Sequence, residues 1–235
     1  MSMRDNLKFN AGPIIINDGL RKYMISVFNK MFLALGLTGI VAYLCASSPE
    51  IITFMSGGFK FILMIATFGI VIYLGARINK ISAEKAEALF WLYAAVLGAF
   101  LSPIVYIYTS ASIANAFFTT AIFFGGMSLF GYVTKKDLTG VGSFMTVGLF
   151  AIIITSFINI IFLKSSALQV GISAICVIIF CGLTAYDVQK IKSFYLESSR
   201  DDETLSKRAT LGALSLYMDF INLFLAMIRL FGDRR

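Results

Sequence analysis

Two aspartates in apolar surroundings are the residues of this sequence best placed for chemistry. Asp219 lies deep inside the last long hydrophobic stretch, and Asp187 ends the stretch before it. An ionised carboxylate at the centre of a bilayer costs about 3 kcal/mol, so an acid there needs a partner, a water path or a bound proton. Because the chain contains no histidine, proton switching near neutral pH has to come from carboxylates.

The composition indicates that these stretches lie in a membrane. Of the 235 residues, 58% are hydrophobic and 14% are charged, whereas soluble domains carry about 25% charged residues. The net charge of +7 does not indicate a nucleic-acid partner, because the basic residues cluster in short segments between apolar runs. The predicted partner is the lipid bilayer.

The chain contains seven apolar runs, each long enough to cross about 30 Å of hydrocarbon as a helix. The sequence therefore predicts an all-α, polytopic bundle of seven transmembrane helices. Residues 1–25 are interpreted as a polar tail leading into an interfacial helix, and residues 26–235 as the transmembrane domain. The polar segment 188–208 is expected to be a soluble loop of mixed charge. The predicted spans are 26–46, 59–76, 88–108, 114–132, 143–163, 168–187 and 209–230.

The distribution of lysine and arginine predicts a cytoplasmic N-terminus. With that orientation, the outer loops contain only Lys60 and Lys164 as basic residues, and the other loop cations lie inside. Seven spans place the C-terminal Gly-Asp-Arg-Arg outside, which the positive-inside rule disfavours. A re-entrant last segment would avoid this, but the length of the run favours a full span.

The last run carries a stripe of small and polar residues at helical spacing. Ser215 and Asn222 lie on the same predicted face as Asp219, and Gly212 and Ala226 extend that face. Such a helix should turn this face to the bundle interior rather than to lipid. The alternative is a packing stripe with one hydrogen-bonded acid, but the cost of burying Asp219 favours a functional role.

Asp187 and Arg77 are weaker candidates when each is taken alone. Asp187 lies three residues before Lys190, so it could be a solvated acid at the membrane surface. Arg77 ends the second span on the same side and could either pair with an acid or anchor the helix. Asp219 lies about 16 Å from Arg208 along a helix, whereas Asp187 lies only about 4–5 Å from Lys190. The two acids can therefore meet only if their helices are offset or if the sixth helix extends beyond the membrane face.

Several segments resemble the Bax inhibitor-1 family of seven-span membrane proteins, and in particular its bacterial branch. They are Gly98–Pro103, Phe124–Leu138, Tyr186-Asp187 with Ile191, and Leu214–Phe224. The resemblance implies six helices wrapped around a central C-terminal helix, a calcium leak, and two aspartates that sense pH. By motif these are Asp187 and Asp219, with Arg77 as the candidate for a latching arginine. It also implies a multi-pass protein of the bacterial inner membrane.

Three classes of function remain open from the residues. Two close carboxylates in a low dielectric cannot both ionise cheaply, so they could share a proton, and on losing it could bind a passing calcium ion. This first class is a pH-gated calcium leak, whose partners are calcium and protons. The second class is a regulatory membrane protein that acts by binding another membrane protein. An intramembrane aspartyl protease is remote, because Asp219 follows Leu-Tyr-Met rather than Gly-x-Gly. We expect no enzyme and no bound cofactor, and a zinc hydrolase is excluded because histidine ligands are missing.

Overall fold

The computed structural model describes residues 18–197 and 201–235, and it confirms the prediction of seven spanning helices. A short additional helix, α2, covers Pro49–Ser56 between the first two spans and was not expected from the sequence. Helix α6 ends in a π-helical turn, Asn159–Leu163. The spanning helices are α1 Asp18–Ala46, α3 Phe59–Arg77, α4 Ala83–Ile107, α5 Ser110–Val133, α6 Thr139–Ile158, α7 Ser166–Glu197 and α8 Asp202–Phe231.

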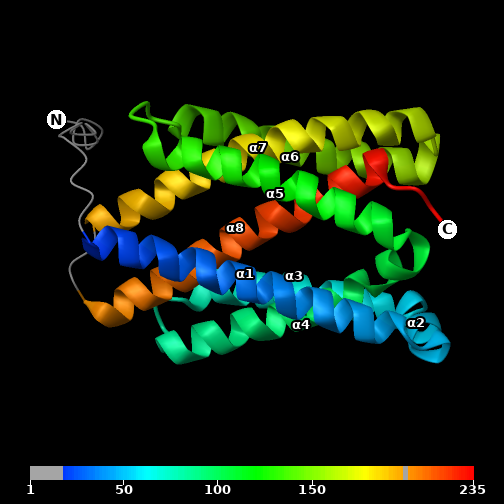
Figure 1. The fold of residues 1–235 in the computed structure, drawn as a ribbon, viewed down its shortest axis with the longest axis horizontal. Helices are drawn as coiled ribbons and strands as arrows, with labels where there is room; N and C mark the ends of the chain where they lie inside the picture. Colours follow the sequence, from blue (N-terminus) through cyan, green and yellow to red (C-terminus); the bar gives the residue numbers. More distant parts are fainter. Residues whose placement is uncertain (1–17, 198–200) are drawn as a thin grey trace.

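The C-terminal helix α8 lies at the centre of the bundle, as predicted (Figure 1). It packs against α1, α4, α5 and α7, while α3 lies outside on α4 and α6 lies outside on α7. Of the most apolar stretch of each helix, 67% is buried in α8 but only 11% in the α6 span. The six other spans therefore form two shells, and the polar stripe of α8 is enclosed by the inner one.

Helix α8 runs the length of the bundle rather than re-entering. The chain after α8 lies at the end of the bundle opposite to the start of α1 (Figure 1). There it pairs with the connection between α4 and α5: Thr109 N–H donates to Asp233 O (3.2 Å), and Arg235 N–H donates to Ile107 O (2.8 Å). Helix α1 is continuous from Asp18 to Ala46, so it crosses the predicted boundary at residue 25 without a break. Residues 1–17 of the predicted tail lie outside the described residues, so the prediction of a separate N-terminal segment stays a prediction.

The expectation of a soluble loop over 188–208 was wrong for most of that segment. Helix α7 continues to Glu197, and α8 begins at Asp202. This segment is amphipathic: Val188 and Ile191 are buried, and Lys190 is exposed. This pattern lets α7 extend beyond the apolar run while still packing on α8.

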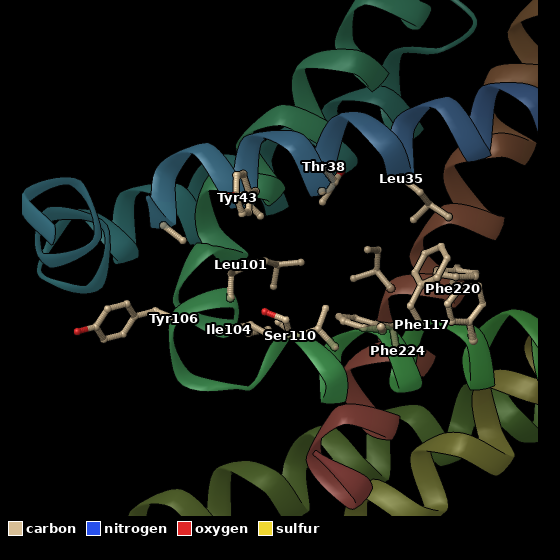
Figure 2. A pocket seen from close by; sticks show the side chains of 18 of the residues that line it. Leu35, Thr38, Tyr43, Leu101, Ile104, Tyr106, Ser110, Phe117, Phe220 and Phe224 are labelled. Carbon is tan, nitrogen blue, oxygen red and sulfur yellow. The ribbon is translucent and has the colours of Figure 1, made fainter. Parts of the chain in front are cut away.

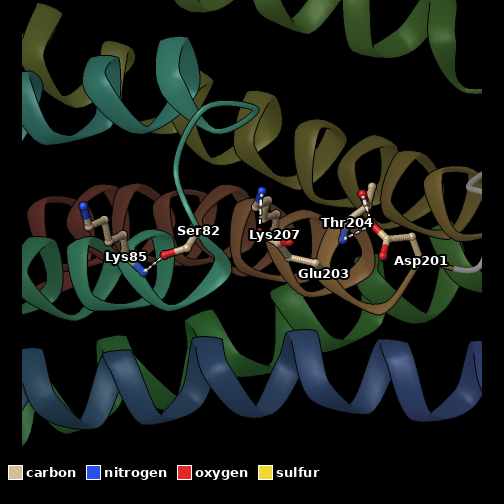
Figure 3. Close-up of polar contacts among 6 residues, drawn as sticks. All are labelled: Ser82, Lys85, Asp201, Glu203, Thr204 and Lys207. Carbon is tan, nitrogen blue, oxygen red and sulfur yellow. Dashed lines mark hydrogen bonds and ion pairs between the residues drawn. The ribbon is translucent and has the colours of Figure 1, made fainter.

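Side-chain caps fix where the central helix α8 and its neighbour α4 begin (Figure 3). At the start of α8, Thr204 donates to Asp201 Oδ2 from its backbone N–H (3.0 Å) and from its hydroxyl (2.6 Å). At the start of α4, Lys85 N–H donates to Ser82 Oγ (3.3 Å). The hydrogen bonds from the Thr204 side chain and backbone hold the pKa of the exposed Asp201 carboxyl below its usual range.

Replacing Asp201 with alanine should loosen the first turn of α8. Because the pKa of Asp201 is lowered in the folded protein, the cap stabilises the helix at neutral pH and is lost as the pH falls through that lowered pKa. We expect faster hydrogen–deuterium exchange at Thr204 and Leu205 in Asp201→Ala at neutral pH. The neighbouring substitution Asp202→Ala is the control, and equal exchange in both variants would contradict this role.

Candidate functional site

Asp219 is buried near the middle of α8. Its side chain is 5% exposed, and its Oδ2 atom has no hydrogen-bond partner among the described residues. Gly212, two turns earlier on the same face, packs against Ile191 of α7, so this face of α8 is turned toward α7. A buried carboxyl oxygen without a partner is costly, and a bound proton, a water molecule or a cation would relieve that cost.

Asp187 is the acid that the structure brings close to Asp219. It is half-buried on α7, ten residues before the end of that helix. The two carboxylates lie close enough to repel each other electrostatically, and the positive charge that acts on Asp187 is that of Lys190, one turn away. The site is therefore an acid pair between α7 and α8, with a lysine beside its more accessible member.

The extension of α7 explains how the two acids reach similar depths. Starting from the contact of Gly212 with Ile191, seven residues lead along α8 to Asp219, and seven residues back along the antiparallel α7 lead to Thr184. Asp187 is three residues from Thr184, an axial offset of about 4.5 Å. The sequence suggested that Asp187 and Asp219 lie at different depths because the sixth span was expected to end at Asp187. Helix α7 instead continues for ten residues beyond Asp187.

The predicted supporting residues of the stripe are less enclosed than Asp219. Ser215 and Asn222 are both half-buried. The Asn222 side-chain amide donates to Met218 O of its own helix (2.8 Å). Asn222 thus satisfies its donor locally, and its predicted support of the acid pair stays a prediction.

Arg77 lies apart from the acid pair in this structure. It is the last residue of α3, in the outer shell, and its side chain is exposed. Among the described residues the ion pairs are Lys30–Glu87 and Lys207–Glu203, so neither acid is paired with Arg77. A latch formed by Arg77 would require α3 to move, and that role stays a prediction.

Two carboxylates alone do not make up a complete coordination shell for calcium. The described residues contain no group of three or more acidic, cysteine or histidine side chains. Calcium takes roughly six to eight oxygen ligands, so two carboxylates would need water or carbonyl oxygens to complete its shell.

The interior of the bundle also contains buried hydroxyl groups that were not predicted from the sequence. Thr38 on α1 and Tyr217 on α8 share a hydrogen bond of 2.6 Å. On α5, the hydroxyls of Thr120 and Ser128 are buried without a partner among the described residues. The signal was available for α5, because residues eight apart lie on one face of a helix.

The fold and this site define an α-helical, seven-span integral membrane protein with an acid pair between its central helix and α7. Residues 20–235 match the family model described as "Inhibitor of apoptosis-promoting Bax1". The chain belongs to the Bax inhibitor-1 family, which confirms the resemblance seen in its motifs.

Curated bacterial proteins are similar to this chain over nearly its whole length. "Inner membrane protein YbhL" of Escherichia coli K12 is 46% identical over 220 residues, covering 92% of this chain and 94% of the relative. "Uncharacterized protein RP147" of Rickettsia prowazekii is 45% identical over 220 residues, covering 93% and 92%. A protein of Caulobacter vibrioides is 40% identical over 230 residues, covering 94% and 92%.

Proposed function

We propose that this protein is a pH-sensitive calcium leak of the bacterial inner membrane, gated by the pair Asp187 and Asp219. The observation that carries the proposal is the burial of Asp219 with an unpartnered carboxyl oxygen beside a second acid. A purely structural aspartate would be expected to have its oxygens satisfied by hydrogen bonds. The inner-membrane location is supported by the name of the relative, inner membrane protein YbhL, and the cytoplasmic N-terminus by the charge distribution.

The proposed gate depends on the proton shared by the two acids. A proton between the carboxyl groups removes the repulsion and holds α7 against α8. When the proton leaves, two negative charges about one helical turn apart in a low dielectric repel each other and separate the helices. The freed oxygens then offer transient ligands to calcium. The only chemical change in this scheme is the transfer of one proton from the acid pair to water, so we propose no enzymatic activity.

Calcium flux into liposomes that contain the full-length protein tests this gate. Wild-type flux should rise with pH, because loss of the shared proton opens the pair. Asp219→Asn and Asp187→Asn remove the repulsion, so flux at high pH should fall by about tenfold, the factor for about 1.4 kcal/mol of lost opening free energy. Its dependence on pH should also disappear.

Asp202→Asn is the matched control, because Asp202 is an exposed acid in the first turn of the same helix. Its flux should match that of the wild type at every pH. Unchanged flux and unchanged pH dependence in both variants of the acid pair would rule out the gate. A cellular phenotype that persists when both acids are Asn would favour the regulatory alternative.

A further inference from the structure

A groove between α1 and α5 opens from the core of the bundle toward the bilayer. Its larger pocket has a volume of about 900 Å³ and is floored by α8 and closed at one side by α4 (Figure 2). Tyr43 on α1 and Phe118 on α5 stand on its rim, and each is 66% exposed. A cavity of this size holds a drug-sized apolar ligand, and an opening in this position admits that ligand from the membrane. Its apolar walls include Leu35, Leu101, Ile104, Phe117 and Phe224.

The length of this pocket matches one leaflet of a bilayer. Along α1 it extends from Leu35 to Ser47, twelve residues or about 18 Å. Half of the hydrocarbon core is about 15 Å thick. At mid-depth the pocket ends at Phe220, which also lines a second, smaller pocket of about 430 Å³ that extends to Arg21 at the other end of the bundle. The groove is thus divided near the middle of the bundle, and the larger pocket faces a single leaflet.

The end of the larger pocket near the C-terminus carries a fixed cation. Arg235 lines the pocket, its backbone N–H donates to Ile107 O (2.8 Å), and its guanidinium donates to Ser110 Oγ (3.3 Å). This end also presents Tyr106, which is 58% exposed, and tyrosine is enriched where helices meet lipid headgroups. Guanidinium groups bind phosphate through paired, charge-assisted hydrogen bonds. An acyl-chain slot that ends at a guanidinium has the polarity of a phospholipid.

We infer that the larger pocket of the α1/α5 groove is a phospholipid site, with an acyl chain along Leu35–Ser47 and the phosphate at Arg235. The two glycines of α1 permit a direct test. A Cβ atom added at Gly39 or at Gly36 meets no atom within 4 Å, but only Gly39 lines the pocket. Gly39→Leu is therefore expected to extend its side chain into the groove, and Gly36→Leu is its matched control on the same helix.

Native mass spectrometry of the full-length protein, titrated with dioleoyl phosphatidylglycerol, measures the site. We expect one saturable lipid adduct in the wild type and in Gly36→Leu, and loss of that adduct in Gly39→Leu. Arg235→Gln should weaken binding by about fivefold, the factor for about 1 kcal/mol per basic side chain at a lipid surface. Dioleoylglycerol, which lacks the phosphate, should bind more weakly and should not respond to Arg235→Gln.

Equal phosphatidylglycerol binding by Gly39→Leu and Gly36→Leu would overturn the site, as would equal binding of the two lipids by the wild type. A dimer mass that disappears in Gly39→Leu alone would show that a second copy of the chain fills the groove, and would also overturn it. Matching thermal stabilities of the two glycine variants in detergent establish that the comparison reports on the groove rather than on folding.

Discussion

Replacing Gly131 with alanine is expected to destabilise the protein, although alanine favours helices. A Cβ atom at Gly131 of α5 would lie 2.2 Å from the carbonyl oxygen of Ala185 on α7. This neighbour is backbone and cannot rotate away, so α5 and α7 have to separate. Overpacking of this kind costs about 1–3 kcal/mol, more than the roughly 1 kcal/mol that Gly→Ala gains in a helix. The thermal midpoint in detergent should fall by about 2–4 °C for each kcal/mol lost.

The matched control for Gly131 lies five residues away on the same helix. A Cβ atom at Gly126 meets nothing within 4 Å, and that residue is exposed. Gly126→Ala should therefore leave the thermal midpoint unchanged or raise it slightly, because only the helix propensity changes. Opposite signs for the two variants would identify the α5–α7 contact as the cause. A midpoint that rises equally in both would contradict the close approach.

This close approach also bears on the acid pair, because Ala185 lies two residues before Asp187. Gly131 lets α5 pack closely against α7 on one side, while Gly212 lets α8 pack against Ile191 of α7 on another. Small residues at helix contacts permit such distances in membranes. We therefore expect Gly131→Ala to change the pH dependence of flux as well as stability, since it shifts the helix that carries Asp187.

The sequence was sufficient to predict the spanning helices but not all of their ends. Hydropathy locates runs such as 59–76, and α3 covers Phe59–Arg77. It fails where a helix continues past its apolar run, as α7 does after Asp187, because charged side chains on an exposed face lower the hydropathy without breaking the helix. Helix α2 was missed because its eight residues, Pro49–Ser56, are too few to register as a span.

The candidate site could be predicted in part. Asp219 stood out because its cost in a membrane is independent of its neighbours. Its proximity to Asp187 depends on the relative depth of two helices, which one-dimensional spacing cannot provide. The pocket between α1 and α5 likewise could not be predicted from the sequence, since residues that line it, such as Thr38 and Phe117, are far apart in the chain.

Tyr217→Ala is expected to be the most destabilising single substitution among those considered. Tyr217 is 0% exposed at the centre of the bundle. Its ring packs edge-on against Phe90 (centroids 5.9 Å apart) and Tyr93 (5.7 Å), both on α4. Its hydroxyl lies 2.6 Å from that of Thr38 on α1, so one side chain joins three helices. Truncating a buried aromatic residue costs about 3–5 kcal/mol, because a cavity remains.

Two further variants distinguish the contribution of the Tyr217 ring from that of its hydroxyl and from that of an exposed tyrosine ring. Tyr217→Phe removes only the hydroxyl, and Thr38 can still donate to the carbonyl of Ala34 or Ala94 (2.9 Å each), so the cost should be about 0.5–1.5 kcal/mol. Tyr73→Ala, on the outer helix α3, removes a ring that is 49% exposed and should change stability by no more than about 0.5 kcal/mol in detergent. If Tyr217→Ala unfolded at the same temperature as Tyr73→Ala, α8 would not be the packing centre of the bundle. A graded series, with Tyr217→Ala far below Tyr217→Phe, requires that the ring is enclosed by α1 and α4, because only an enclosed ring leaves a cavity that the surroundings cannot refill.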